Sequence, residues 1–369
     1  MAPTMTHFPV GNGDMTLMKL ENDVTVLVDM NIAQATISIC DVVPKLKARL
    51  AKDASGRHYV DLLIVTHPDE DHCRGIQENF YLGNPIEYPD RSNKIFIKEI
   101  WCSPIVYRRE CTDNPLSESA KALNGEAKRR GSLCKNANWE SINDGNRVKF
   151  LGEDDFGYMK DLSSIHHKTK STLCNISGLE AYVIGPLSKT DIEEDKYKKN
   201  NTSLILQMKI KSGTNHAACK FLIGGDSEVE VWEAVWKAYK GDKDRLKHDI
   251  LLAPHHCSWR SISKDSSSKN NAPKVCDDAI SALSQTESYS RIVSSSQTIK
   301  DNDSDPPSHR AMERYKEIAS YFYCTNESYE SDNKILEFII SAEGPRKKIS
   351  DTVGAASGNA VVGQTYSHG

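Results

Sequence analysis

Four potential metal ligands stand close together in one short segment of the sequence: His67, Asp69, Asp71 and His72. In a short loop, alternate side chains can point at one centre, while the adjacent pair Asp71 and His72 can serve a second centre. Known two-metal hydrolytic sites hold their cations roughly 3.5–4 Å apart, which suits this spacing. The segment therefore predicts a site for two metal ions.

Two further groups of ionisable residues each follow an apolar run. Asp226 comes after residues 220–223 and two glycines, which let the chain turn sharply, and His255 and His256 come after residues 249–253. A single Asp-rich loop is usually a solvated turn or a helix cap. Three such clusters are better explained by a shared site, because burying many ionisable groups together is costly unless cations neutralise them.

Strands must position these clusters. The short apolar run Tyr59–Thr66 leads directly into His67, and a helix is expected to open at Cys73. α/β proteins build sites at strand ends in this way. Strands are predicted at residues 16–20, 24–29, 59–66, 95–101, 179–184, 203–210, 220–223, 249–253, 291–295 and 334–340. Helices are predicted at residues 39–52, 228–239 and 308–320.

The composition describes a chain that can bury a large core. Its 369 residues are 38% hydrophobic and 27% charged, and the formal net charge is −4. A negative net charge gives no bulk attraction to nucleic acid, which weakens a nucleic-acid role without removing it. Because no apolar run approaches about 18 residues, we expect no membrane span. Ten scattered cysteines and no secretion signal lead us to expect a cytoplasmic protein with reduced thiols.

The segment from His67 to His72 resembles the H-x-[HD]-x-D-H signature of the metallo-β-lactamase fold superfamily. Four shorter segments, in the same order along the chain, are similar to motifs of the hydrolase domain of the competence protein ComEC and its soluble relatives. These segments are Val10–Asp14, Asn200–Leu206, Phe221–Asp226 and Pro254–Ser258. The resemblance implies a four-layer αββα sandwich over residues 1–343, with an insertion at about 102–178, followed by a flexible tail at 344–369.

The same resemblance implies a set of six ligands for two divalent metal ions, Zn²⁺ or Mn²⁺. His67 and Asp69 would hold the first metal, and Asp71 and His72 would hold the second. Asp226 would bridge the two metals, and His256 would complete the ligands of the second.

Other residues receive supporting roles from the resemblance. His255 would act catalytically beside the metals, as a substrate contact or proton donor, and Asp71 is counted as catalytic as well as a ligand. Asp14 and Asn201 would orient the loops of the site, as metal sites commonly require. His309 would face the rim of the site.

The sequence departs from the wider family pattern at the first metal. Asp69 stands where many members have a histidine, and no histidine stands near Gly185, where many members place another ligand. The upstream pair His166 and His167 is a candidate substitute. Without it the first metal would be held loosely in an oxygen-rich shell, which suits Mn²⁺ better than a histidine-rich one. Cys257 replaces a family glycine and is interpreted as structural rather than as a ligand.

The expected activity is hydrolysis by a hydroxide held between the two cations. A phosphodiester substrate, either nucleic acid or a nucleotide-type molecule, fits best because cations screen its charge, so we predict a phosphodiesterase or nuclease. Lysine-rich loops at Lys189–Lys199 and Ser261–Lys269 are candidates for substrate contact. Two alternatives stay open: a hydrolase of a lactone, thioester or other acyl substrate, and a non-catalytic binding protein that retains the fold.

Overall fold

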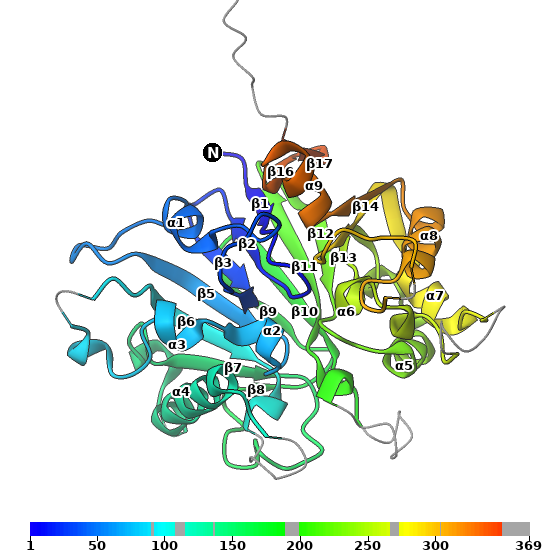
Figure 1. Ribbon diagram of the computed structural model, residues 1–369. Coiled ribbons are helices and arrows are strands. Elements are labelled where there is room, and N and C mark those ends of the chain that lie inside the picture. Colours follow the sequence, from blue (N-terminus) through cyan, green and yellow to red (C-terminus); the bar gives the residue numbers. More distant parts are fainter. Residues whose placement is uncertain are drawn as a thin grey trace, which may run out of the picture.

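Two β-sheets face each other and carry helices on their outer sides, which makes a four-layer αββα sandwich (Figure 1). The computed structural model describes residues 1–89, 92–107, 115–135, 137–188, 199–265, 273–302 and 304–348. The predicted sandwich is confirmed. All ten predicted strands and all three predicted helices are present, with shifts of a few residues at their ends.

The first sheet has the strand order β17-β16-β1-β2-β3-β5-β6-β7-β8. The strands from β3 to β8 run parallel to their neighbours, and the others pair antiparallel. Their bounds are β1 Thr4–His7, β2 Thr16–Lys19, β3 Thr25–Val28, β5 Tyr59–Val65, β6 Phe96–Cys102, β7 Arg147–Leu151, β8 His166–His167, β16 Leu336–Ser341 and β17 Gly344–Lys347. A two-residue strand, β4 (Met30–Asn31), bridges to Cys73 and Arg74.

The second sheet has the order β15-β14-β13-β12-β11-β10-β9. Strands β9 to β12 pair antiparallel, and β12 to β15 pair parallel. Their bounds are β9 Thr172–Ile176, β10 Leu179–Gly185, β11 Ile205–Ser212, β12 Asn215–Ile223, β13 His248–Leu252, β14 Thr286–Ser294 and β15 Tyr321–Cys324. The parallel strands of both sheets end toward one edge of the sandwich, where the candidate site lies (Figure 1).

The α-helices form the two outer layers. They are α1 Val42–Lys47, α2 Glu70–Cys73, α3 Ile76–Asn79, α4 Glu118–Cys134, α5 Val229–Tyr239, α6 Pro254–Cys257, α7 Asp277–Leu283, α8 His309–Ile318 and α9 Thr325–Asp332. Short 3₁₀ helices lie at η1 Pro85–Glu87, η2 Pro104–Tyr107, η3 Trp139–Ser141, η6 Lys199–Thr202, η7 Lys243–Arg245 and η8 Trp259–Ser261. Over the described ranges, none of the helices has the length and apolar character needed to cross a membrane.

Three apolar cores hold the layers together, and the alternation of side chains along each strand divides the residues among them. On β5, Ile64 points between the two sheets, while Leu63 packs with the helix layer that includes Leu123 of α4. On the second sheet, Leu222 of β12 packs outward with Trp232 of α5. The central strands are therefore buried on both faces, which explains their continuous apolar runs.

One boundary differs from the sequence-based expectation. The tail was expected to begin at residue 344, but Gly344–Lys347 forms β17 and pairs with β16 from Ser341 to Phe338. Gly344, with a φ of +117°, makes a tight hairpin turn that looked like the start of a tail. Residues 349–369 lie outside the described ranges. The segment 102–178 supplies α4 and β7 to β9, which extend both sheets.

Candidate metal centre

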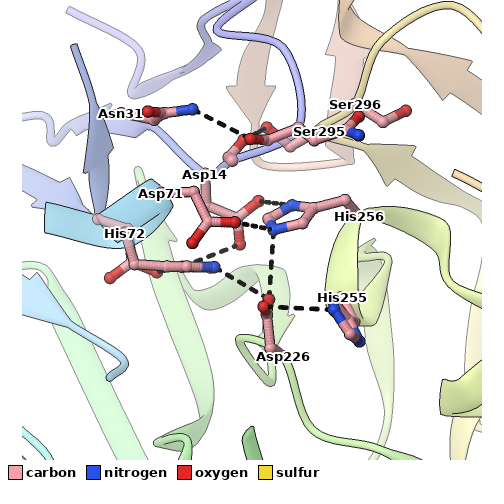
Figure 2. Close-up of polar contacts among 12 residues, drawn as sticks. Asp14, Asn31, Asp71, His72, Asp226, His255, His256, Ser295 and Ser296 are labelled. Atoms are coloured by element: carbon pink, nitrogen blue, oxygen red, sulfur yellow. Dashed lines mark hydrogen bonds and ion pairs between the residues drawn. The ribbon is translucent and has the colours of Figure 1, made fainter. Parts of the chain in front are cut away.

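The three ionisable clusters converge at the edge of the sandwich, although they lie far apart in the sequence. The loop after β5 carries His67 and leads into α2, which carries Asp71 and His72. The turn after β12 carries Asp226. Figure 2 shows Asp71, His72 and Asp226 pointing toward one centre, with the α6 histidines facing them from the other side.

Asp226 lies in the middle, and each of its carboxylate oxygens faces a different pair of histidines. Its Oδ1 atom is 2.9 Å from Nε2 of His72 and 3.3 Å from Nε2 of His256. Its Oδ2 atom is 3.7 Å from Nε2 of His67 and 3.6 Å from Nε2 of His255. This arrangement places one shared carboxylate between two separate sets of donor atoms.

We call the set on the Oδ1 side the second donor set. It contains Asp71, His72, Asp226 and His256, whose donor atoms all lie within 4.8 Å of one another. Oδ2 of Asp71 is 3.1 Å from Nε2 of His256. The structure therefore brings together the residues expected at the second metal, including His256 rather than His255 as its fourth member.

The set on the Oδ2 side, the first donor set, contains His67 and Asp69, whose Nε2 and Oδ2 atoms are 3.9 Å apart. The substitutes considered for the absent histidine are not among the histidines that the structure pairs with Asp226. The His166 ring makes a 2.7 Å hydrogen bond with the carbonyl of Gly152. Burial, with Lys149 close by, lowers the pKa of His167 to about 4. The charged groups that act on His167 are Lys149 and His166, not the carboxylates of the site.

Asp29 is a part of the centre that the sequence analysis missed. Its carboxylate is fully buried, lies 2.9 Å from Nδ1 of His72, and accepts 2.7 Å hydrogen bonds from the backbone N–H and hydroxyl of Thr66. The Thr66 hydroxyl also lies 3.1 Å from Nδ1 of His67. A partner at Nδ1 fixes an imidazole ring and leaves its Nε2 atom facing the centre. Asp29 therefore positions His72 directly and His67 through the hydroxyl of Thr66. The available signal was an aspartate directly after the apolar strand beside β5.

Asp14 has the matching role for His256. Its Oδ1 atom is 3.4 Å from Nδ1 of His256. The loop that carries Asp14 is tied down by hydrogen bonds from Ser295 to the carbonyl of Gly13, at 2.7 Å, and from Asn31 to the carbonyl of Asn12, at 3.1 Å (Figure 2). The structure thus places Asp14 beside Nδ1 of His256, and its orienting role stays a prediction.

Three other expectations have mixed outcomes. Asn201 is buried in η6, beside Thr202, whose carbonyl accepts a 2.7 Å hydrogen bond from the hydroxyl of Ser103. His309 begins α8, and its Nδ1 lies 3.7 Å from Asp301; its expected place at the rim of the site stays a prediction. Cys257 is fully buried, and burial raises the pKa of its thiol, as expected for a structural cysteine.

The charges of the cluster are strongly coupled to one another. Burial alone would lower the pKa of His72, but Asp226 and Asp29 raise it well above its usual value. Against the same burial effect, Asp226 and Asp14 raise the pKa of His256 to about 10. Burial would raise the pKa of Asp226, yet the neighbouring histidines hold it well below its usual range. Protons on two histidines therefore offset part of the negative charge of the carboxylates in the metal-free centre.

The donor atoms fit divalent cations. Among the described residues, Nε2 of His67, Nε2 of His72 and Oδ1 of Asp226 are buried without a well-aligned hydrogen-bond partner. Such groups are costly to bury unless something binds them. Imidazole nitrogen and carboxylate oxygen are donors that Zn²⁺ and Mn²⁺ both accept. The four residues of the second donor set therefore suit a divalent cation.

Metal affinity is expected to rise with pH. The protons on His72 and His256 stabilise the metal-free fold fully below about pH 6.5. The contribution of His256 is lost as the pH rises through about 10, and that of His72 is lost as the pH rises through its own raised pKa. A metal must displace them, so the apparent affinity for Zn²⁺ should increase by up to about 10-fold per pH unit for each proton released. Calorimetric titration from about pH 6 to 8, in buffers of different ionisation enthalpy, measures both quantities. A pH-independent affinity without proton release would contradict this prediction.

The fold and the donor groups together describe an α/β sandwich with a candidate two-metal centre. The sequence matches no family model and none of the curated proteins. Among solved structures, the chain is similar to unliganded yeast PDE1, with 12% identity, a TM-score of 0.39, and coverage of 88% of this chain and 97% of that one. It is also similar to Igni18, a metallo hydrolase from Ignicoccus hospitalis, with 12% identity, a TM-score of 0.34, and coverage of 87% and 94%.

A third similar structure is Zn²⁺-bound PqqB from Methylobacterium extorquens, with 9% identity, a TM-score of 0.37, and coverage of 87% of this chain and 97% of that one. Identities and TM-scores this low do not carry a functional assignment. We therefore base the proposed function on the donor groups of this chain alone.

Proposed function

We propose that this protein is a metal-dependent hydrolase of phosphodiesters, acting on nucleic acid or a nucleotide-type substrate. The observation that supports this proposal is the position of Asp226, whose Oδ1 and Oδ2 atoms face two different donor sets. When bound, two divalent cations supply an activated water at neutral pH and neutralise the charge that develops on the attacked group.

The residues of the chain would divide the work as follows. His67 and Asp69 would hold the first cation, and Asp71, His72 and His256 would hold the second. Asp226 would be shared between them. Asp29 and Asp14 would act behind the ligands: their carboxylates lie 2.9 Å and 3.4 Å from the Nδ1 atoms of His72 and His256, and so keep the Nε2 atoms directed at the centre.

Bound cations would make the centre more accessible to an anionic substrate. The five buried or half-buried carboxylates, Asp14, Asp29, Asp69, Asp71 and Asp226, carry a formal charge of −5, which two divalent cations would reduce to −1. The loaded centre would therefore repel a phosphodiester less than the metal-free centre does, and the cations themselves would attract its oxygens. Most residues of the two lysine-rich loops proposed for substrate contact lie outside the described ranges.

The direct test is hydrolysis of bis-p-nitrophenyl phosphate and single-stranded DNA by the full chain, loaded with Mn²⁺ or Zn²⁺. We expect turnover that depends on the metal, and a loss of at least about 100-fold in kcat/KM for Asp71→Ala, because a ligand contributes more than the roughly 10–100-fold of an outer partner. Asp161→Ala is the control, since this aspartate is exposed and pairs only with Lys135 among its described ionic contacts.

A simple lactone, offered in the same assay, separates the two hydrolase classes. Turnover of the lactone without turnover of either phosphodiester would replace the proposed substrate class by an acyl substrate. Two tightly bound metals with no turnover of any of the three substrates would also contradict the proposed activity on general phosphodiesters.

A further inference from the structure

We propose that His255 is a metal ligand that completes the first donor set and replaces the histidine that is absent near Gly185. The inference rests on the proposed two-metal centre. It changes the expected role of His255, which the sequence analysis interpreted as a substrate contact or proton donor. With His255 included, the first donor set consists of His67, Asp69, Asp226 and His255.

The distances around Asp226 support this assignment. Nε2 of His255 lies 3.6 Å from Oδ2 of Asp226, and Nε2 of His67 lies 3.7 Å from the same oxygen. The two histidines thus face one carboxylate oxygen at 3.6 and 3.7 Å, a wider spacing than the 2.9 and 3.3 Å at which His72 and His256 face the other. Each half of the centre then has two imidazoles, one carboxylate of its own and one oxygen of the shared carboxylate.

The backbone of α6 is shaped to direct two consecutive imidazoles at one carboxylate. His255 and His256 have φ/ψ values of +49°/+49° and +52°/+38°, and Cys257 follows with a φ of +67°. Left-handed conformations at residues other than glycine cost about 1–3 kcal/mol each and persist where the surrounding structure imposes them. A hydrogen bond from the backbone N–H of His255 to the carbonyl of Gly225, at 3.0 Å, ties this turn to the turn that carries Asp226.

The two rings approach the centre from different directions. Their centroids are 6.0 Å apart and their planes are 74° apart, and both face Asp226 in Figure 2. If only His256 were needed as a ligand, a single directed side chain would suffice. The repeated left-handed conformation therefore supports a function for both histidines at the same carboxylate.

His255 also differs from the other three histidines, and the difference predicts unequal metal affinities. Its side chain is 13% exposed, while those of His67, His72 and His256 are at most 1% exposed. Among the described residues, Nδ1 of His255 has neither a hydrogen-bond partner nor a nearby carboxylate in an ion pair, whereas Nδ1 of His256 lies 3.4 Å from Oδ1 of Asp14, so the ring of His255 is the less constrained of the two. The first donor set should consequently bind its metal more weakly than the second.

The experiment measures metal binding to the full chain, independently of turnover. The metal-stripped protein is titrated with Zn²⁺ against a chromophoric chelator, and with Co²⁺ followed by its visible absorption. We expect two sites of unequal affinity in the wild type. His255→Gln should keep the tight site and weaken the other by at least about 100-fold, more than the roughly 10–100-fold loss associated with outer partners.

Three further variants make the result specific. Asp69→Asn should weaken the same site as His255→Gln, and His256→Gln should weaken the tight site instead. His167→Gln, at the alternative histidine pair, should leave both affinities unchanged. Loss of the weak site in His167→Gln would overturn the assignment. It would also be overturned if His255→Gln lost turnover while both metal affinities stayed unchanged, because His255 would then be a proton donor.

A second measurement uses only the wild-type protein, so it tests the assignment even if a variant fails to fold. In the Co²⁺-loaded wild type, each coordinated imidazole gives one strongly shifted Nδ1–H signal in proton magnetic resonance, and Nδ1 of His255 is buried from solvent. Four such signals are expected, and three would contradict the assignment. Two bound metals with four signals but no phosphodiester turnover would refute the proposed function alone, whereas a chain that binds no metal would refute both.

Discussion

Replacing Asp226 by asparagine is expected to abolish tight binding of both metals and to lower kcat/KM by at least about 1000-fold, equal to roughly 4 kcal/mol of transition-state stabilisation. The reason is the central position of this carboxylate, whose two oxygens face His72 and His256 on one side and His67 and His255 on the other. An amide keeps the shape but removes the charge and one acceptor oxygen, so both donor sets lose their common member.

The measurement is metal content after equilibrium dialysis, followed by kcat/KM with bis-p-nitrophenyl phosphate. Asp249→Asn is the matched control, because this carboxylate is also partly buried and accepts a 2.7 Å hydrogen bond from the backbone N–H of Lys220 on another part of the sheet. It should keep both metals and nearly all activity. An Asp226→Asn protein that still binds two metals tightly would refute the shared-carboxylate arrangement.

The sequence was sufficient to predict the layers and most of the strands. Apolar runs such as Tyr59–Val65 form strands that are buried on both faces, so composition and length alone reveal them. Short strands were harder to predict. The two-residue strand β8 and the exposed strand β9 depend on pairing with neighbours rather than on their own apolar pattern. Tertiary contacts decide such elements, and those contacts are invisible in a local window.

The candidate centre was predictable to the extent that ligands directly follow strands. Asp71 and Asp226 were found because ionisable residues after apolar runs are unusual. Asp29 also follows a strand, but it is a single aspartate with no neighbouring ligand. Asp29 is brought to Nδ1 of His72 by the parallel pairing of β3 with β5 and by its own left-handed backbone, which has a φ of +52°. Its role therefore depends on sheet topology rather than on local spacing.

The backbone at α6 explains why the relation between His255 and His256 could not be predicted. Sequence rules assign left-handed conformations to glycine, yet three consecutive residues other than glycine adopt them here. The direction of each imidazole follows from that conformation, so spacing alone could not divide the two histidines between the donor sets.

Gly225→Ala is expected to lower the stability of the protein substantially. Gly225 has a φ of +48°, and an added Cβ would lie 2.8 Å from the hydroxyl of Thr66 and 3.1 Å from Cβ of Ser203. The left-handed backbone costs about 1–2 kcal/mol for alanine, and crowding in a packed interior typically adds about 1–3 kcal/mol. We therefore expect the free energy of unfolding to fall by about 2–5 kcal/mol, measured by chemical denaturation of the metal-free protein.

Gly213→Ala separates the two contributions to this loss. Gly213 has a similar φ of +59°, but a Cβ there would meet nothing within 4 Å, so only the backbone cost of about 1–2 kcal/mol applies. The variants should also differ in Zn²⁺ affinity. Crowding at Gly225 displaces Thr66, whose hydroxyl donates to Asp29 and lies beside Nδ1 of His67, whereas Gly213 is in the β11–β12 turn. Equal losses of stability and unchanged Zn²⁺ affinity in both variants would show that the contact between Gly225 and Thr66 does not position the ligands.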